Sequence, residues 1–271
     1  MNAMVRQPAV SGRFYPADPF ELAHQVEQFT KESGKEKITA LGCMVPHAGY
    51  IYSGHVAGAV FEKLRMPSQI LLLGPRHFPR GAPVAILSRG TWRTPLGEAK
   101  IDSALAEDLK HACRALHEDP VAHSSEHSLE VQIPFLQQLA GDFSFVPVVL
   151  GTGRYEVFEE LGTAVAQVIS AQKSPVLVVA SSDMNHYEND QITRVKDHLA
   201  IEQILAFDPR GLFDTVNRED ISMCGYGAAV TMLIAVRALG AKRAELIQYA
   251  TSGDINHSRD QVVGYAGIII Q

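Results

Sequence analysis

Several short segments of the chain are apolar at almost every position, without the alternation that a half-exposed strand shows. Continuous apolar runs of this length are typical of strands that are covered on both faces. We predict such strands at Ala40–Val45, Gln69–Leu73, Phe143–Leu150, Pro175–Ala180 and Val262–Ile270. Weaker patterns indicate two more, at Pro83–Leu87 and Ala244–Ala250.

Between these runs, apolar residues recur at helical spacing. The first predicted helix runs through Phe29 and opens on Asp18 and Pro19, an N-cap residue followed by proline at the first helical position. The segment Leu129–Leu139 has helical spacing too, but Pro134 predicts a kink or a late start. The other predicted helices are Gly54–Leu64, Asp102–Ala112, Tyr155–Ser170, Ile192–Phe207 and Gly227–Leu239.

Strands that alternate with helices predict an α/β fold with a central, mostly parallel or mixed sheet and helices on both faces. A chain of 271 residues is long enough to bury a large core. The one linker-like stretch, Lys31–Lys37, more plausibly joins the first helix to the first strand than separates two domains. We therefore expect a single domain over residues 1–271.

Composition narrows the class of protein. The net charge is −6, with no basic excess to pair with phosphates, which argues against a nucleic-acid partner. No apolar run approaches the roughly 20 residues that span a bilayer, and the first residues lack the apolar core of a signal peptide. The three cysteines are too scattered for a disulfide framework. We expect a cytoplasmic protein without a membrane partner and with reduced thiols.

Polar turns that contain histidine follow three of the predicted strands. His47 follows the first strand, His77 follows the second, and His186 follows the fourth, in a turn that also holds Asp183. Ligands of open α/β sheets bind beyond the carboxyl ends of the strands, where these turns lie. A single histidine among 11 is more often a surface residue. Three at equivalent positions favour a metal site, because imidazole is the commonest transition-metal ligand.

Cys224 is a fourth candidate ligand. It lies between glycine-rich turns just before a predicted helix, where the helix dipole favours a thiolate. Cys43 and Cys113 lie within predicted elements and read as core residues.

A second polar cluster, His123–Glu130, precedes an apolar helix and is also explained by helix capping. Its spacing does not decide whether His127 and Glu130 face the site or the solvent. We interpret His55, His111, His117 and His198, on helical patterns, as surface residues. The sequence has no glycine-rich nucleotide loop, no G-x-S-x-G and no H-E-x-x-H.

The chain resembles the Memo family over nearly its whole length. The matching segments, in chain order, are RQPAVSGRFYPADP, VPHAGYIYSG, LLLGPRHF, TPLGEAKID, EHSLEVQIPFL, VPVVLG, VASSDMNHY, MCGYGA, YATSGD and VVGYAG. The family is similar in fold to class III extradiol dioxygenases, whose ferrous iron is held by two histidines and a glutamate.

The resemblance implies a role for each candidate residue. His47 and His77 take the two histidine ligand positions, and Cys224 falls where those enzymes carry the glutamate. His186 falls at their acid–base histidine with Asp183 beside it, and His127 matches a further pocket histidine. A thiolate suits Fe(II), Cu(I) or Zn(II) and makes ring-cleaving oxygenation doubtful, since it is itself oxidisable.

The resemblance leaves several functions open. Family members are described as iron- or copper-binding, some as redox-active, and an animal member as binding phosphotyrosine peptides. The alternatives are a redox metalloenzyme acting on an unknown small molecule, a non-catalytic metal-handling protein, a peptide- or partner-binding module and a zinc hydrolase. The sequence names neither the substrate, nor the native metal, nor the oligomeric state.

Overall fold

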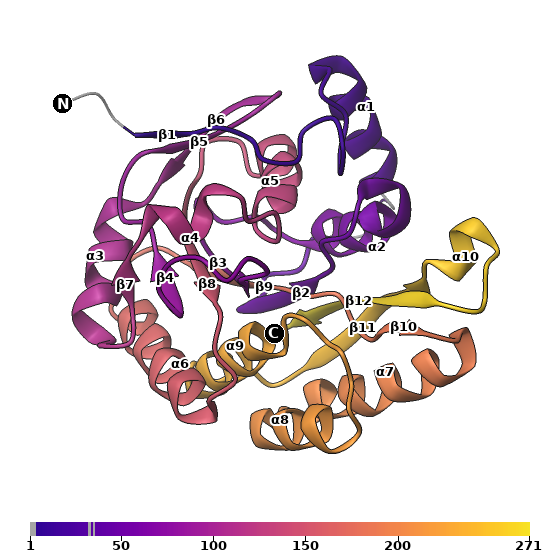
Figure 1. Cartoon of the computed structure of the whole chain (residues 1–271). Helices are drawn as coiled ribbons and strands as arrows, with labels where there is room; N and C mark the ends of the chain where they lie inside the picture. The colour runs from indigo at the N-terminus through magenta and orange to yellow at the C-terminus, as the bar shows by residue number, and fades with distance from the viewer. Residues whose placement is uncertain (1–3, 32–33, 35) are drawn as a thin grey trace.

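The middle of the sheet consists of neighbouring parallel strands, in the order β8-β3-β9-β2. The computed structural model describes residues 4–31, 34 and 36–271 (Figure 1), so residues 32, 33 and 35 of the predicted linker lie outside it. The central strands are β2 (Gly42–Val45), β3 (Gln69–Pro75), β8 (Ser144–Leu150) and β9 (Val176–Ser181). Beside β2 run β12 (Val262–Ile270) and then β11 (Ala244–Thr251), each antiparallel to its neighbour, which makes the sheet mixed.

The central strands are buried on both faces, as their continuous apolar runs predict. In β9, Val178 and Ala180 pack into one hydrophobic core, whereas Leu177 and Val179 pack into the other. All four side chains are at most 1% exposed. The apolar runs are therefore continuous because alternate residues of each strand pack into two different cores, one on each side of the sheet.

Helices cover both faces, as expected (Figure 1). One core is closed by α1 (Pro19–Phe29), α2 (Tyr50–Lys63) and α5 (Ile133–Leu139). The other core is closed by α3 (Ser103–Ala112), α6 (Tyr155–Ser170), α7 (Asp190–Leu205), α8 (Pro209–Arg218) and α9 (Tyr226–Ala238). The α/β architecture predicted from the sequence is thus confirmed.

Element boundaries differ most from the prediction at two helices. A 3₁₀ turn, Glu130–Gln132, precedes α5, and Pro134 lies in the first turn of that helix, so the late start is the alternative that holds. Helix α2 begins at Tyr50, four residues before the predicted start at Gly54. Its glycines mark a close approach: a Cβ on Gly58 would lie 2.4 Å from the carbonyl oxygen of Phe29 in α1.

Besides helix α8, the apolar pattern missed the short peripheral elements, apart from β4, whose weak signal was correct. Strand β6 exposes alternate side chains and so gives no apolar run. His117 lies in β7 rather than on a helix, but it is exposed, as expected. These elements are β1 (Val5–Arg6), β4 (Val84–Ile86), β5 (Thr91–Thr94), β6 (Gly97–Ile101), β7 (His117–Glu118), α4 (Pro120–Ser124), β10 (His186–Glu188) and α10 (Gly253–Asn256).

A buried ion pair ties the N-terminal segment to the polar cluster before α5. Glu130 is 1% exposed and accepts hydrogen bonds from Arg6, from Tyr15 and from two backbone N–H groups. Arg6 also donates to the carbonyl oxygens of His123 and Glu126. Glu130 therefore faces inward, but towards the N-terminal segment.

Within the described residues, no helix is both long and apolar enough to cross a membrane.

Candidate metal centre

The carboxyl ends of β2, β3 and β9 bring the candidate residues together at one edge of the sheet. Val45 pairs with Ser181, and Leu73 with Ala180, so the three strands end level with one another. His47 and His77 follow β2 and β3, and Cys224 comes from the loop that leads into α9. One ligand atom from each of these three residues lies within 4.8 Å of the other two.

The spacing within this triad is close to that of metal ligands. Cys224 Sγ lies 3.2 Å from His47 Nε2. Ligand atoms at 2.0–2.3 Å from a tetrahedral ion are about 3.3–3.8 Å apart. His47 is buried, Cys224 is half-buried and His77 is exposed, so the triad is reached from the His77 side.

The protonation of His47 follows from its neighbours. Its Nδ1 lies 2.9 Å from Ser181 Oγ, and that hydroxyl donates its own hydrogen to the Ser128 carbonyl oxygen at 2.7 Å. Ser181 Oγ must therefore accept from Nδ1–H. The lone pair of His47 is consequently on Nε2, the atom next to Cys224.

A carboxylate fixes His77 in the same tautomer. Its Nδ1 lies 2.8 Å from Glu126 Oε1, and its backbone N–H donates to Glu126 Oε2 at 2.6 Å. Burial raises the pKa of the Glu126 carboxyl, but the hydrogen bond and charge of His77 and the Ser128 N–H outweigh it and lower that pKa to about 2. An ionised carboxylate can only accept, so His77 carries a hydrogen on Nδ1, and in the neutral ring its lone pair is on Nε2.

His186 has a free lone pair as well, but outside the triad. Its Nδ1 lies 2.9 Å from the Ser222 carbonyl oxygen, and its backbone N–H donates to Ser222 Oγ at 2.7 Å. Since a carbonyl oxygen can only accept, Nδ1 carries a hydrogen, and in the neutral ring the lone pair is on Nε2. When protonated, His186 acts electrostatically on both His47 and Asp183, which places it at the same site.

Asp183 is buried beside the triad. Its Oδ1 accepts the backbone N–H of His47 at 2.7 Å, so it positions the turn that carries this candidate ligand. The contact that orients the His186 ring comes from Ser222 and not from Asp183. Burial raises the pKa of the Asp183 carboxyl above its usual value, against the opposing charge of His186.

Gly225 permits the close approach of Cys224. A Cβ on this glycine would lie 2.4 Å from the Ser181 carbonyl oxygen, and its N–H donates to Ser182 Oγ at 3.0 Å. Burial, followed by the charge of Asp183, raises the pKa of the Cys224 thiol well above its ordinary value. The thiolate expected from the helix dipole is thus disfavoured in the metal-free protein, because desolvation outweighs the dipole.

His127 packs against the two candidate histidine ligands, His47 and His77. Its ring stacks on His77 with the centroids 4.4 Å apart, and the rings of Phe14 and His47 lie at 4.7 and 5.6 Å. Burial, and then the charges of His47 and His77, lower its pKa to about 4. His77, Glu126 and His127 also lie within ligand distance of one another, but the carboxylate in this group is saturated by N–H donors.

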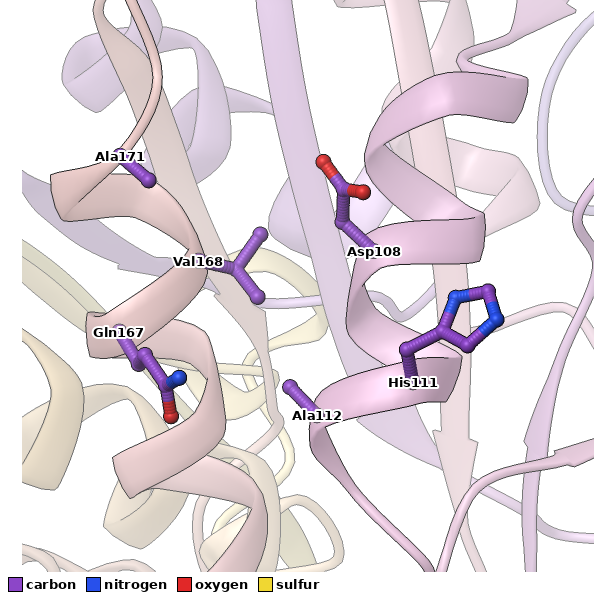
Figure 2. A pocket seen from close by; sticks show the side chains of 6 residues that line it. All are labelled: Asp108, His111, Ala112, Gln167, Val168 and Ala171. Atoms are coloured by element: carbon purple, nitrogen blue, oxygen red, sulfur yellow. The ribbon is translucent and has the colours of Figure 1, made fainter.

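A cavity of about 470 Å³ lies elsewhere, in the groove between α3 and α6 (Figure 2). Its polar lining residues are Asp108, His111 and Gln167. The Nδ1 of His111 bonds to the Glu107 carbonyl oxygen of its own helix, and the ring is exposed. This groove shows no converging ligands, and His111 remains a surface residue as predicted.

Fold and site together define an α/β protein with histidine and cysteine side chains gathered at the carboxyl edge of its sheet. The Memo-like protein family matches residues 6–269, and the chain belongs to this family. It is 41% identical to a MEMO1 family protein of Methanopyrus kandleri, over 99% of both chains. It is 42% identical to one of Archaeoglobus fulgidus, over 98% of this chain and 100% of the relative.

A solved structure supports the fold independently of sequence. The chain is similar to the crystal structure of an uncharacterized protein from Escherichia coli K12, with a TM-score of 0.55 and 15% identity. The match covers 82% of this chain and 98% of that one.

Proposed function

We propose that this chain is a mononuclear metalloenzyme that binds iron or copper through His47 Nε2, His77 Nε2 and Cys224 Sγ. The observation that carries the proposal is the convergence of three ligand atoms within 4.8 Å, with both histidines in the tautomer that leaves Nε2 free. Two imidazoles and one thiolate suit Fe(II), Cu(I) and Zn(II), so the donor set fits these ions. Three protein ligands leave a coordination position for a small substrate.

The surrounding residues support an enzyme over a metal-handling protein. A bound iron or copper ion supplies electron transfer and Lewis acidity. Outside the triad, His186 Nε2 has a lone pair with which to accept a proton from a bound substrate, and the Ser222 carbonyl holds its ring. Asp183 keeps the His47 turn in place through the backbone N–H. Affinity alone does not need a free, oriented imidazole beside the ligands.

Metal analysis with spectroscopy tests the proposal directly. Protein purified anaerobically from its own host is expected to contain about one iron or copper per chain. X-ray absorption at the metal edge should show one sulfur ligand at about 2.3 Å. A metal-free preparation that also fails to take up Fe(II), Cu(I) or Zn(II) would contradict the proposal.

The binding of metal should release one proton from Cys224. Burial and Asp183 raise the pKa of this thiol well above its ordinary value, and burial lowers the pKa of His47, so the pair is neutral near pH 7. A ligating thiolate must lose its proton, and higher pH favours that loss. Zn(II) affinity measured by chelator competition should therefore rise about tenfold per pH unit above pH 7. A flat profile would contradict thiolate ligation, and Cys224→Ala should abolish the slope.

A further inference from the structure

Glu126 is a buried carboxylate with no lysine or arginine partner among the described residues. It is fully buried, and its Oε1 accepts three N–H groups: His77 Nδ1–H at 2.8 Å and the backbone N–H groups of His127 and Ser128 at 2.9 Å each. Its Oε2 accepts the His77 backbone N–H at 2.6 Å. Four N–H donors stabilise the ionised form of the carboxyl group, so the side chain is an anion.

The nearby Arg6 side chain does not neutralise the charge of the Glu126 carboxylate. Arg6 reaches only the backbone carbonyl of Glu126, and its ion pair is with Glu130. Among the described residues, no lysine or arginine side chain lies within ion-pair distance of the Glu126 carboxylate; its ion-pair contacts are His77 and His127. A buried charge without a counter-charge is costly, which points to a cation close by.

The cation would bind on the side of the His77 ring that faces away from Glu126. Nδ1–H of His77 points at the carboxylate, and Nε2 belongs to the atoms that converge with His47 and Cys224. A carboxylate behind a ligating imidazole fixes its orientation and makes it a stronger donor. It also adds a negative charge that acts on the ion through space.

We propose that Glu126 is a positioning residue that holds His77 for metal binding through Nε2 and biases the centre towards a divalent over a monovalent ion. This inference rests on the metal site of the proposed function. The energy between a fixed charge and an ion scales with the charge of the ion, so a divalent ion gains twice as much from Glu126 as Cu(I) does. A role in orientation alone would change both affinities equally.

The test compares Zn(II) and Cu(I) affinities of the full chain, measured anaerobically with chelators of known affinity. In Glu126→Gln, Zn(II) affinity should fall about 10–100-fold. Cu(I) affinity should fall by about half as much on a logarithmic scale, which is about 3–10-fold. The matched control is Glu130→Gln, which removes a buried carboxylate of the same segment that has a cationic partner and does not contact His77. Its Zn(II) to Cu(I) ratio should equal that of the wild type.

Each outcome bears on a different claim. Wild-type protein that binds neither ion would overturn the proposed function. Wild-type binding with an unchanged ratio in Glu126→Gln would overturn the charge role of Glu126 and leave the proposed function standing. If Glu126→Gln does not fold, Glu126→Asp keeps the charge, and its ratio must stay at the wild-type value. A ratio that moves towards Cu(I) in that variant would overturn the inference.

Discussion

Replacement of Cys224 by alanine is expected to weaken Fe(II) or Cu(I) binding by at least about 100-fold, more than the loss of an outer-shell partner costs. The reason is that Cys224 Sγ and His47 Nε2, 3.2 Å apart, are two of the three converging ligand atoms. His47→Ala should lose affinity to a similar extent. Anaerobic titration of metal-free protein measures both effects.

Cys43→Ser is the matched control. Cys43 is fully buried in β2 and belongs to the core, and burial raises the pKa of its thiol. Its replacement should leave the metal affinity unchanged. An equal loss in Cys43→Ser and Cys224→Ala would show that binding reflects unspecific thiol chemistry.

The fold should survive the loss of metal. Two hydrophobic cores flank the sheet, and a core of this size does not need a metal to fold. Cys224→Ala should therefore keep the far-ultraviolet circular dichroism of the wild type. Only the rise in melting temperature on addition of metal should disappear.

The layered fold was predictable because each central strand is buried on both faces. Residues such as Leu177 and Val179 belong to a different core from Val178 and Ala180, and the sequence records this as an unbroken apolar run. Strand β6 exposes alternate residues and left no such run. Helix α8 was missed although Asp208 caps it and proline follows, because its apolar positions are few.

The convergence of the candidate ligands was predictable for a topological reason. Histidines that follow parallel strands must meet at one edge of the sheet, and the level ends of β2, β3 and β9 bring His47 and His77 together. The residues that fix their tautomers were not singled out, because each acts across a large separation in sequence. Glu126 is 49 residues from His77, and Ser181 is 134 residues from His47. The one local signal for Glu126 was its place beside His127 in the polar cluster.

The protonation state of the Cys224 thiol could not be predicted from the sequence either. Its position before α9 suggested a thiolate, since helix N-termini attract negative charge. In the folded chain the thiol is half-buried next to Asp183, and both burial and that carboxylate oppose ionisation. Sequence indicates the direction of the dipole, but not the desolvation that competes with it.

His186→Ala is expected to separate catalysis from metal binding. The ring lies outside the triad of converging atoms, and its Nε2 is free because Nδ1–H donates to the Ser222 carbonyl. The variant should therefore bind Fe(II) with nearly wild-type affinity. An oriented general acid or base contributes typically 10²–10⁴-fold in rate, so turnover should fall by about that factor.

The measurement pairs anaerobic Fe(II) titration with dioxygen consumption by the iron-loaded protein in the presence of ascorbate. His198→Ala is the matched control, because this histidine is exposed on α7 and its Nδ1 bonds to the Arg194 carbonyl of the same helix. It should change neither quantity. A large drop in Fe(II) affinity in His186→Ala would make His186 a ligand. Unchanged affinity with unchanged turnover would remove its acid–base role and favour a metal-handling protein, because the free imidazole is the feature that distinguishes an enzyme from a storage site.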